Sequence, residues 1–409
     1  MTENLLPAPG PHRGRIAAVV IVCWLFVVFD GYDLIVYGNV IASLQREWGI
    51  GPGEAGTIGS VGLAGMLVGA LVAGRLSDAV GRRWAVLGTV VVLSVFTGLC
   101  ALADGPIVFA ALRFCAGLGL GGLVPTSNAM VAEIVPARWR PAAATLNMSG
   151  VPLGGCVAAV AGLWIIPEWG WRPMFAIAVL PALVLVPVAV LVLPSDADGR
   201  GKNTARAGFG AILRGEWRTP SLLFAAATVA TLLAWYGLGT WLPKLMQEAG
   251  TDLGGSLRFA LALNLGAVLG SLGTAWAGMR FGAVRSGAVA ALLAGAGLLA
   301  LLASPPPAVT VALLVVAGVG THGTQCLVIA AIATAYPAAL RGTALGWALG
   351  VGRIGAVAAP QLAGWLLGAG GGPASSFVLF AGAALITALV LGALARRPVG
   401  VVGMAPIVV

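Results

Sequence analysis

Twelve apolar runs, most of them about 20 residues long, divide the chain and restrict its fold more than any other feature. The hydrocarbon core of a bilayer is about 30 Å thick, and about 20 residues of helix cross it. Apolar residues make up 59% of the 409 residues and charged residues only 9%, so lipid must be the main solvent. The runs lie at about 16–40, 55–75, 84–103, 106–133, 141–165, 173–193, 220–246, 256–279, 286–303, 308–335, 341–368 and 374–395. We therefore expect an all-α membrane protein with twelve transmembrane helices.

The distribution of basic residues predicts how these helices are oriented. An even number of spans puts both termini on one side. If that side is the cytoplasm, 17 of the 23 Lys and Arg residues lie in cytoplasmic segments and four lie outside, which fits the positive-inside rule. The basic residues stand singly or in pairs in short loops, so nucleic acid is not an expected partner.

A polar stretch and an internal repeat divide the chain into two halves. The stretch carries eight charged residues and separates six spans from six, which predicts a six-helix bundle over 1–194, a cytoplasmic linker over 195–219 and a second bundle with a short tail over 220–409. With a shift of 201 residues, four pairs coincide: Pro136 with Pro337, Arg140 with Arg341, Gly154 with Gly355, and Gly81 with Gly282. The two bundles are therefore expected to be pseudo-symmetric, with a substrate site between them near the midplane.

The loop between spans two and three reads Gly74-Arg75-Leu76-Ser77-Asp78-Ala79-Val80-Gly81-Arg82-Arg83. It resembles the loop signature of the major facilitator superfamily, which implies that superfamily's fold and alternating access. In the second half Met279 stands where Asp78 would be, so a conformational latch is expected mainly in the first half. We assign gating to Gly74, Asp78, Gly81, Arg82 and Arg83, and to Glu133 and Arg138 beside them. For Glu133 we favour an ion pair that holds one conformation shut over proton carriage.

Four further segments resemble the aromatic acid/proton symporter family within that superfamily. They are Asp30-Gly31-Tyr32-Asp33-Leu34-Ile35-Val36-Tyr37-Gly38, the stretch from Arg113 through Gly122 to Pro125, Thr321-His322-Gly323-Thr324-Gln325, and Gly352-Arg353-Ile354-Gly355. The resemblance covers essentially the whole chain. It implies a proton-coupled symporter that imports a small aromatic carboxylate of the benzoate or hydroxybenzoate type, as a monomer in a bacterial inner membrane.

Asp30 and Asp33 are the only carboxylates deep in a span, and a spacing of three puts them on one helical face. Ionised acids in a membrane are costly, so two of them need a reason. One reason is proton coupling or substrate gating; the other is a static ion pair with Arg113, which can lie at the same depth in span four. We favour proton coupling, with Arg113 pairing in turn with an aspartate and with a bound carboxylate.

Two basic side chains lie near the midplane of the second half, His322 and Arg353. No acid lies inside the spans of that half, so an anionic substrate is the natural complement of Arg353. Backbone carbonyls and a first-half aspartate are the alternative partners. For His322, substrate binding and a satisfied buried hydrogen bond remain equally open.

Other polar and aromatic side chains well inside the spans complete the candidate substrate site. The aromatic ones can stack on a substrate ring or simply pack helices, and the amides can bind ring hydroxyls or join helices. The candidates are Tyr32, Trp235, Tyr236 and Trp347, with Asn147 and Gln325.

Two other classes of function compete with import. The segment Gly150-Val151-Pro152-Leu153-Gly154-Gly155 partly resembles an antiporter signature, which keeps proton-coupled export of small organic molecules or drugs as the alternative. An enzyme lacks support, because the chain has two histidines, no Cys/His cluster and no phosphate loop. We therefore expect no metal and no cofactor.

Overall fold

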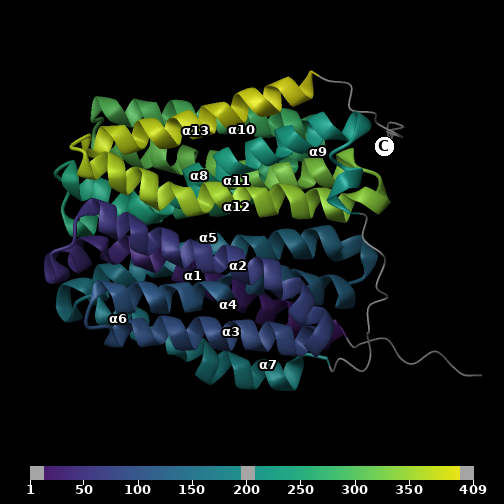
Figure 1. The fold of residues 1–409 in the computed structure, drawn as a ribbon, viewed down its shortest axis with the longest axis horizontal. Helices are drawn as coiled ribbons and strands as arrows, with labels where there is room; N and C mark the ends of the chain where they lie inside the picture. The colour runs from purple at the N-terminus through teal and green to yellow at the C-terminus, as the bar shows by residue number, and fades with distance from the viewer. Residues whose placement is uncertain (1–12, 195–207, 397–409) are drawn as a thin grey trace, which may run out of the picture.

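A computed structural model of the protein describes residues 13–194 and 208–396, and these residues form a bundle of long helices (Figure 1). In the first half the helices are α1 (Arg13–Trp48), α2 (Pro52–Val80), α3 (Arg82–Leu99), α4 (Pro106–Ile134), α5 (Arg140–Trp169), α6 (Arg172–Ala176) and α7 (Val186–Val192). In the second half they are α8 (Arg218–Glu248), α9 (Leu253–Phe281), α10 (Ala283–Ala300), α11 (Pro307–Ala335), α12 (Ala338–Gly368) and α13 (Gly372–Ala395). Together α6 and α7 form one broken span, so the described residues contain the twelve helical spans that the sequence predicts.

Eleven of these spans are long and apolar enough by composition to cross a membrane, within the described residues. The twelfth is α12, which is 31 residues long, rich in Gly and Ala, and carries Arg341 and Arg353. In the sixth span, a 3₁₀ turn (Ile177–Val179) and a π-helical turn (Pro181–Leu185) separate α6 from α7. Pro181 and Pro187 remove two backbone amides from this region. The apolar run predicted the span but not its break.

The two halves repeat the same helix pairing. In the first half α1 packs on α5 and α2 on α4; in the second, α8 packs on α12 and α9 on α11. A Cβ added to Gly117 would lie 2.2 Å from the Gly62 carbonyl oxygen, and one added to Gly318 would lie 2.0 Å from that of Leu263. Both residues of the second contact are displaced by 201 positions from the first, so the repeat in sequence is a repeat in space.

Short turns link neighbouring helices at equivalent places. Gly81 and Gly282, again 201 positions apart, have φ angles of 90° and 88°. A residue with a Cβ rarely adopts such angles, so glycine is required where α2 turns into α3 and α9 into α10. The two loops therefore share this turn geometry at their glycines, although only the first carries the acidic residue.

The halves lie side by side, with α1 to α7 in one layer and α8 to α13 in the other (Figure 1). They meet through α1 on α8, α2 on α12, and α5 on α9. At the first of these crossings the equivalent glycines Gly38 and Gly239 meet, since a Cβ on Gly38 would lie 2.4 Å from the Gly239 carbonyl oxygen. The predicted linker limits, 195 and 219, stay a prediction: residues 195–207 lie outside the described part, and α8 begins at Arg218.

A polar clasp joins α2 to α12 at the side of the bundle where α1 ends and α2 begins. Thr57 donates a hydrogen bond to the side-chain oxygen of Gln361 over 2.8 Å, and the Gln361 backbone amide donates to Ser60 over 3.1 Å. Pro360 precedes Gln361, and its carbonyl accepts from Trp241 over 3.0 Å. The Gln361 contacts join the two halves at this side of the bundle.

Candidate functional site

Asp33 of α1 is neutralised inside the first half. Its Oδ1 lies 2.7 Å from Nη1 of Arg113 on α4 and accepts a second hydrogen bond, of 2.6 Å, from the hydroxyl of Thr97 on α3. Arg113 also donates to the backbone carbonyl of Asp33 over 3.3 Å. Both charged side chains are buried. The pairing of Arg113 with an aspartate, expected from their depths, is therefore confirmed for Asp33.

Asp30, one helical turn before Asp33, has a different environment. The residue is 1% exposed, and its Oδ1 has no hydrogen-bond partner among the described residues. Its charge interacts with those of Arg353 and Asp33, at longer range than a direct ion pair. The two aspartates share a helical face as predicted, but only Asp33 has a direct cationic partner in this conformation.

Arg353 of α12 reaches across the interface between the halves. Its Nη1 donates to the hydroxyl of Tyr236 on α8 over 3.0 Å and contacts the sulfur of Met66 on α2 at 2.9 Å. The described residues give it no direct ion pair. Among the described residues, therefore, neither a backbone carbonyl nor an aspartate is its direct partner. Asp30 is the carboxylate that interacts with it electrostatically, at longer range.

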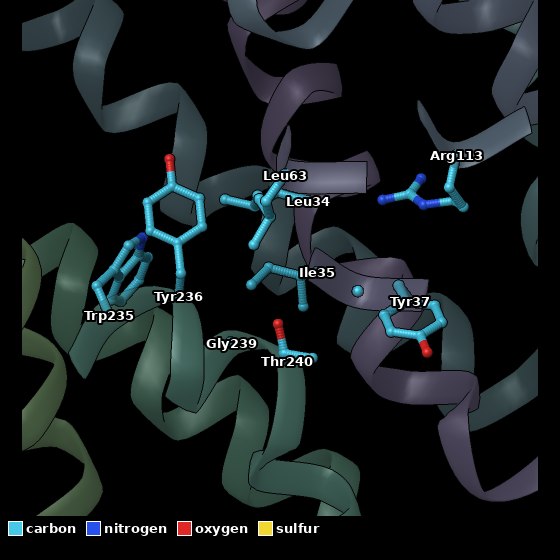
Figure 2. A pocket seen from close by; sticks show the side chains of 10 residues that line it. Leu34, Ile35, Tyr37, Leu63, Arg113, Trp235, Tyr236, Gly239 and Thr240 are labelled. Atoms are coloured by element: carbon cyan, nitrogen blue, oxygen red, sulfur yellow. The ribbon is translucent and has the colours of Figure 1, made fainter. Parts of the chain in front are cut away.

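A pocket lies between the halves and beside these groups (Figure 2). Its walls come from α1, α2, α4 and α8 and include Leu34, Tyr37, Leu63, Arg113, Tyr236 and Thr240. Figure 2 shows the Arg113 guanidinium on one side of the apolar centre and Trp235 with Tyr236 on the other. Its lining is mostly apolar with a few polar groups at the edge, as in small-molecule sites, and in this conformation the space holds about one water molecule.

His322 of α11 lies against Trp235 of the α8 wall, and Gln325 follows it by three residues on the same helix. The His322 ring lies 5.0 Å from that of Trp235, between centroids, and its Nε2 has no partner among the described residues. The side-chain oxygen of Gln325 also lacks a partner there. Buried polar atoms are rarely left unsatisfied in a native protein, so both remain candidates for contact with substrate or water.

Three other predicted site residues make contacts within their own half. The Tyr32 hydroxyl donates to the carbonyl of Met174 over 2.7 Å, and the Trp347 indole donates to that of Ser221 over 3.1 Å. The Asn147 amide donates to Asn128 over 2.8 Å. The structure does not bring these side chains into the pocket walls.

Sequence reasoning missed several residues that the structure brings into contact with the site. Tyr37 and Thr240 line the pocket, Met66 touches Arg353, and Thr97 binds Asp33. A spacing of four from Tyr236 was the available signal for Thr240, because it places both on one face of α8. No comparable signal marked Met66.

The predicted gating residues gather where α2, α3 and α4 end or begin. Nη1 of Arg82 lies 2.5 Å from Oε1 of Glu133, so the expected ion pair is present, and Arg83 donates to the Val190 carbonyl. Arg138 lies over the ring of Trp139 at 5.9 Å. Gly74 is exposed on α2, whereas the side chain of Asp78 lies outside the described part. The gating role itself stays a prediction.

Comparisons with known proteins cover nearly all of the chain. A family model described as "Major Facilitator Superfamily" matches residues 23–279. A gentisate transporter of Corynebacterium glutamicum is 57% identical over 94% of this chain and 88% of its own length. A benzoate transport protein of Acinetobacter baylyi is 34% identical over 85% of this chain and 83% of its own length. The crystal structure of a D-xylose-proton symporter shares the fold, with a TM-score of 0.73, 16% identity, and coverage of 92% of this chain and 97% of that one.

Proposed function

The chain belongs to the major facilitator superfamily, as a multi-pass membrane transporter and not an enzyme, and from this premise we propose that it imports a small aromatic carboxylate together with protons by alternating access. The names of two relatives, a gentisate transporter and a benzoate transport protein, support the class of substrate. The observation that carries the proposal is the Arg353 guanidinium, which lies beside an apolar pocket and has no direct ion pair among the described residues.

Arg353 is the proposed site of the substrate carboxylate. A guanidinium offers five N–H donors and can hold a carboxylate by two parallel hydrogen bonds. Among the described residues Arg353 uses one nitrogen, Nη1, for its contacts, which leaves the other donors for an anion. Tyr236 joins this cation to the pocket, since its hydroxyl accepts from Arg353 and its ring lines the pocket wall.

The balance of buried charge explains why a proton accompanies the anion. Deep in the spans the chain has two acids, Asp30 and Asp33, and two permanent cations, Arg113 and Arg353. An anion entering alone would add an uncompensated charge to a region of low dielectric constant, where its cost is high. One proton delivered with each anion keeps the sum at zero.

Asp30 is the proposed acceptor of that proton. When ionised, Asp30 is the acidic group that interacts with Arg353, although no direct ion pair joins them. Protonation removes this negative charge, and the substrate carboxylate takes its place beside Arg353. Asp33 is paired with Arg113 in this structure, so Asp30 and not Asp33 is the proposed carrier of the proton.

The direction of import follows from the membrane orientation that we propose. The excess of Lys and Arg in the loops on the side of the termini assigns that side to the cytoplasm of a bacterial inner membrane. The clasp at Gln361 then closes the outer side, and protons that move inward carry the substrate with them.

Export by antiport has weaker support. The glycine-rich segment that suggested it has a packing role in α5, because a Cβ on Gly154 would lie 1.8 Å from the Val28 carbonyl oxygen on α1. Close helix contact therefore accounts for the motif without a second mechanism.

Uptake into proteoliposomes tests the proposal. With an acid exterior and an alkaline lumen, radiolabelled gentisate, benzoate or 4-hydroxybenzoate should accumulate above its equilibrium level, and a protonophore should abolish the accumulation. The neutral amide 2,5-dihydroxybenzamide should compete poorly, because it lacks the carboxylate. Accumulation driven only by an acid lumen would indicate antiport, and no uptake of any aromatic acid would overturn the proposal.

A further inference from the structure

Thr240 of α8 is a buried residue whose hydroxyl the fold leaves unused. The residue is 6% exposed and makes no hydrogen bond with any residue that the structure describes. Threonines inside helices usually donate to the carbonyl four residues earlier, and Thr228 on the same helix does so, to Phe224 over 2.7 Å. Thr240 therefore differs from Thr228 in having a hydroxyl that no described residue pairs with.

The free hydroxyl belongs to the pocket between the halves. Figure 2 shows the Thr240 oxygen directed toward the side of the pocket where Ile35 lies. The other hydroxyl groups of the α1 and α8 walls are already bonded: the Tyr37 hydroxyl donates to the Ala55 carbonyl over 2.6 Å, and the Tyr236 hydroxyl accepts from Arg353. Thr240 is therefore the unpaired hydroxyl of these two walls.

The Thr240 hydroxyl lies at a distance from the proposed carboxylate site that matches a substituent on the opposite edge of an aromatic ring. Tyr236 and Thr240 lie four residues apart on one helical face, a rise of about 6 Å. An acid whose carboxylate binds Arg353 beside Tyr236 extends along α8 by about one benzene ring before it reaches Thr240. Leu34 and Leu63 supply apolar contacts to the ring on the opposite side.

Gly239 leaves the pocket wall beside Thr240 without a side chain. Gly239 lines the pocket next to Thr240, and a Cβ added there would meet only Cδ1 of Ile35, at 2.9 Å. This contact is with the end of a flexible side chain, so the glycine is not required by backbone packing on that side. Its small size keeps the pocket open.

We propose that Thr240 recognises a hydroxyl group on the substrate ring, and that the pocket prefers hydroxylated benzoates to benzoate itself. This inference rests on the proposed function and names its substrate class more narrowly. A hydroxyl group can both donate and accept, so Thr240 pairs with a phenolic hydroxyl in either sense. Benzoate leaves the buried Thr240 hydroxyl without a partner, which lowers its affinity relative to a hydroxylated acid.

Binding measurements on purified full-length protein test the inference, with benzoate and 2,5-dihydroxybenzoate as the paired probes. Thr240→Val keeps the shape and removes the hydroxyl, so the preference for 2,5-dihydroxybenzoate over benzoate should fall three- to tenfold, the range of one net hydrogen bond. Thr240→Ser should keep the preference. Thr228→Val is the matched control on the same helix, and it should leave the preference unchanged.

A second pair of variants tests whether the ring occupies the pocket. Gly239→Ala places a methyl group in the pocket and should lower the affinity for both acids at least fivefold. Gly382→Ala on α13, where a Cβ would meet nothing within 4 Å, should lower neither affinity.

If Thr240→Val does not fold, a comparison of Thr240→Ala with Thr240→Ser tests the same role of the hydroxyl.

The outcomes separate the inference from the proposed function. If the native protein binds aromatic acids but the ratio of the two affinities is unchanged in Thr240→Val, the role of Thr240 is overturned while the transporter assignment stands. An equal loss for both acids in Thr240→Val also overturns it, since that result indicates a structural hydroxyl. If the native protein binds no aromatic acid, the proposed function fails and this inference fails with it.

Discussion

Asp33 and Arg113 form a buried ion pair, with Oδ1 and Nη1 2.7 Å apart, whereas Asp30, one turn earlier on the same helix, has no direct cationic partner among the described residues. The two aspartates therefore differ in function on our account. Asp33 stabilises the contact of α1 with α4, and Asp30 is left to exchange its proton. This difference leads to separate predictions for the two residues.

Asp33→Asn should destabilise the protein. The substitution leaves the Arg113 guanidinium buried without its charge partner, and breaking a buried pair by removing one member costs about 3 to 5 kcal/mol. We expect a lower unfolding temperature in detergent, measured by intrinsic fluorescence. The double variant Asp33→Asn with Arg113→Gln should recover part of the loss. No change in the single variant would show that the pair contributes nothing to stability.

Arg353→Ala should lose aromatic acid binding almost completely. Each charge-assisted hydrogen bond contributes about 1.5 to 3 kcal/mol, so losing two predicts at least a hundredfold drop in affinity. Arg353→Lys keeps the charge but loses the planar fork, and should bind more weakly than the native protein. Calorimetry or scintillation proximity would measure both, with Arg285→Ala in the α9–α10 region as the control. Normal binding by folded Arg353→Ala would move the anion site to Arg113.

Glu133→Gln should slow transport while leaving substrate affinity nearly unchanged. The Arg82–Glu133 pair joins α3 to α4 within the first half and contacts none of the pocket residues named above. Removing its charge should alter the relative stability of conformations and not the site. Turnover in proteoliposomes and equilibrium binding would be compared. A large loss of affinity with normal turnover would contradict a gating role.

Gln361→Leu should loosen the closed side of the bundle. The variant loses the contacts of Gln361 with Thr57 and Gly53 across the two halves, while the backbone bond to Ser60 can remain. In a background without native cysteines, a cysteine placed at Leu63 reports access to the pocket. A membrane-impermeant maleimide added from the α1–α2 side should label it faster in Gln361→Leu. Equal labelling rates in the two backgrounds would exclude the clasp as a determinant of closure.

The fold could be predicted largely from run lengths and one repeat. Apolar runs of span length can form only helices in lipid, and the 201-residue shift located pairs such as Gly81 and Gly282 that have equal φ angles. The break between α6 and α7 was not predicted, because hydropathy indicates that a segment lies in lipid but says nothing of its backbone hydrogen bonds. It depends instead on Pro181 and Pro187.

The site could be predicted in part. The sequence indicates how deep a residue lies in the membrane, but not which neighbouring helix its side chain faces. Depth alone paired Arg113 with an aspartate, but it could not separate Asp30 from Asp33. It also could not tell that the Tyr32 hydroxyl bonds to Met174, away from the pocket. Such choices depend on which neighbouring helix a side chain faces, and tertiary packing fixes that.

In the proposed mechanism Asp30 exchanges a proton while Arg353 exchanges a carboxylate. Asp30→Asn imitates the protonated state permanently, so the variant should still bind substrate and exchange labelled for unlabelled substrate across the membrane. It should be unable to accumulate substrate against its gradient.

The most direct measurement compares two assays on Asp30→Asn in the same proteoliposomes. One is uptake driven by an acid exterior and an alkaline lumen, and the other is counterflow at equal pH with unlabelled substrate inside. We expect pH-driven accumulation to be lost and counterflow to persist. Accumulation equal to that of the native protein would contradict it, because the proton would then travel by another group.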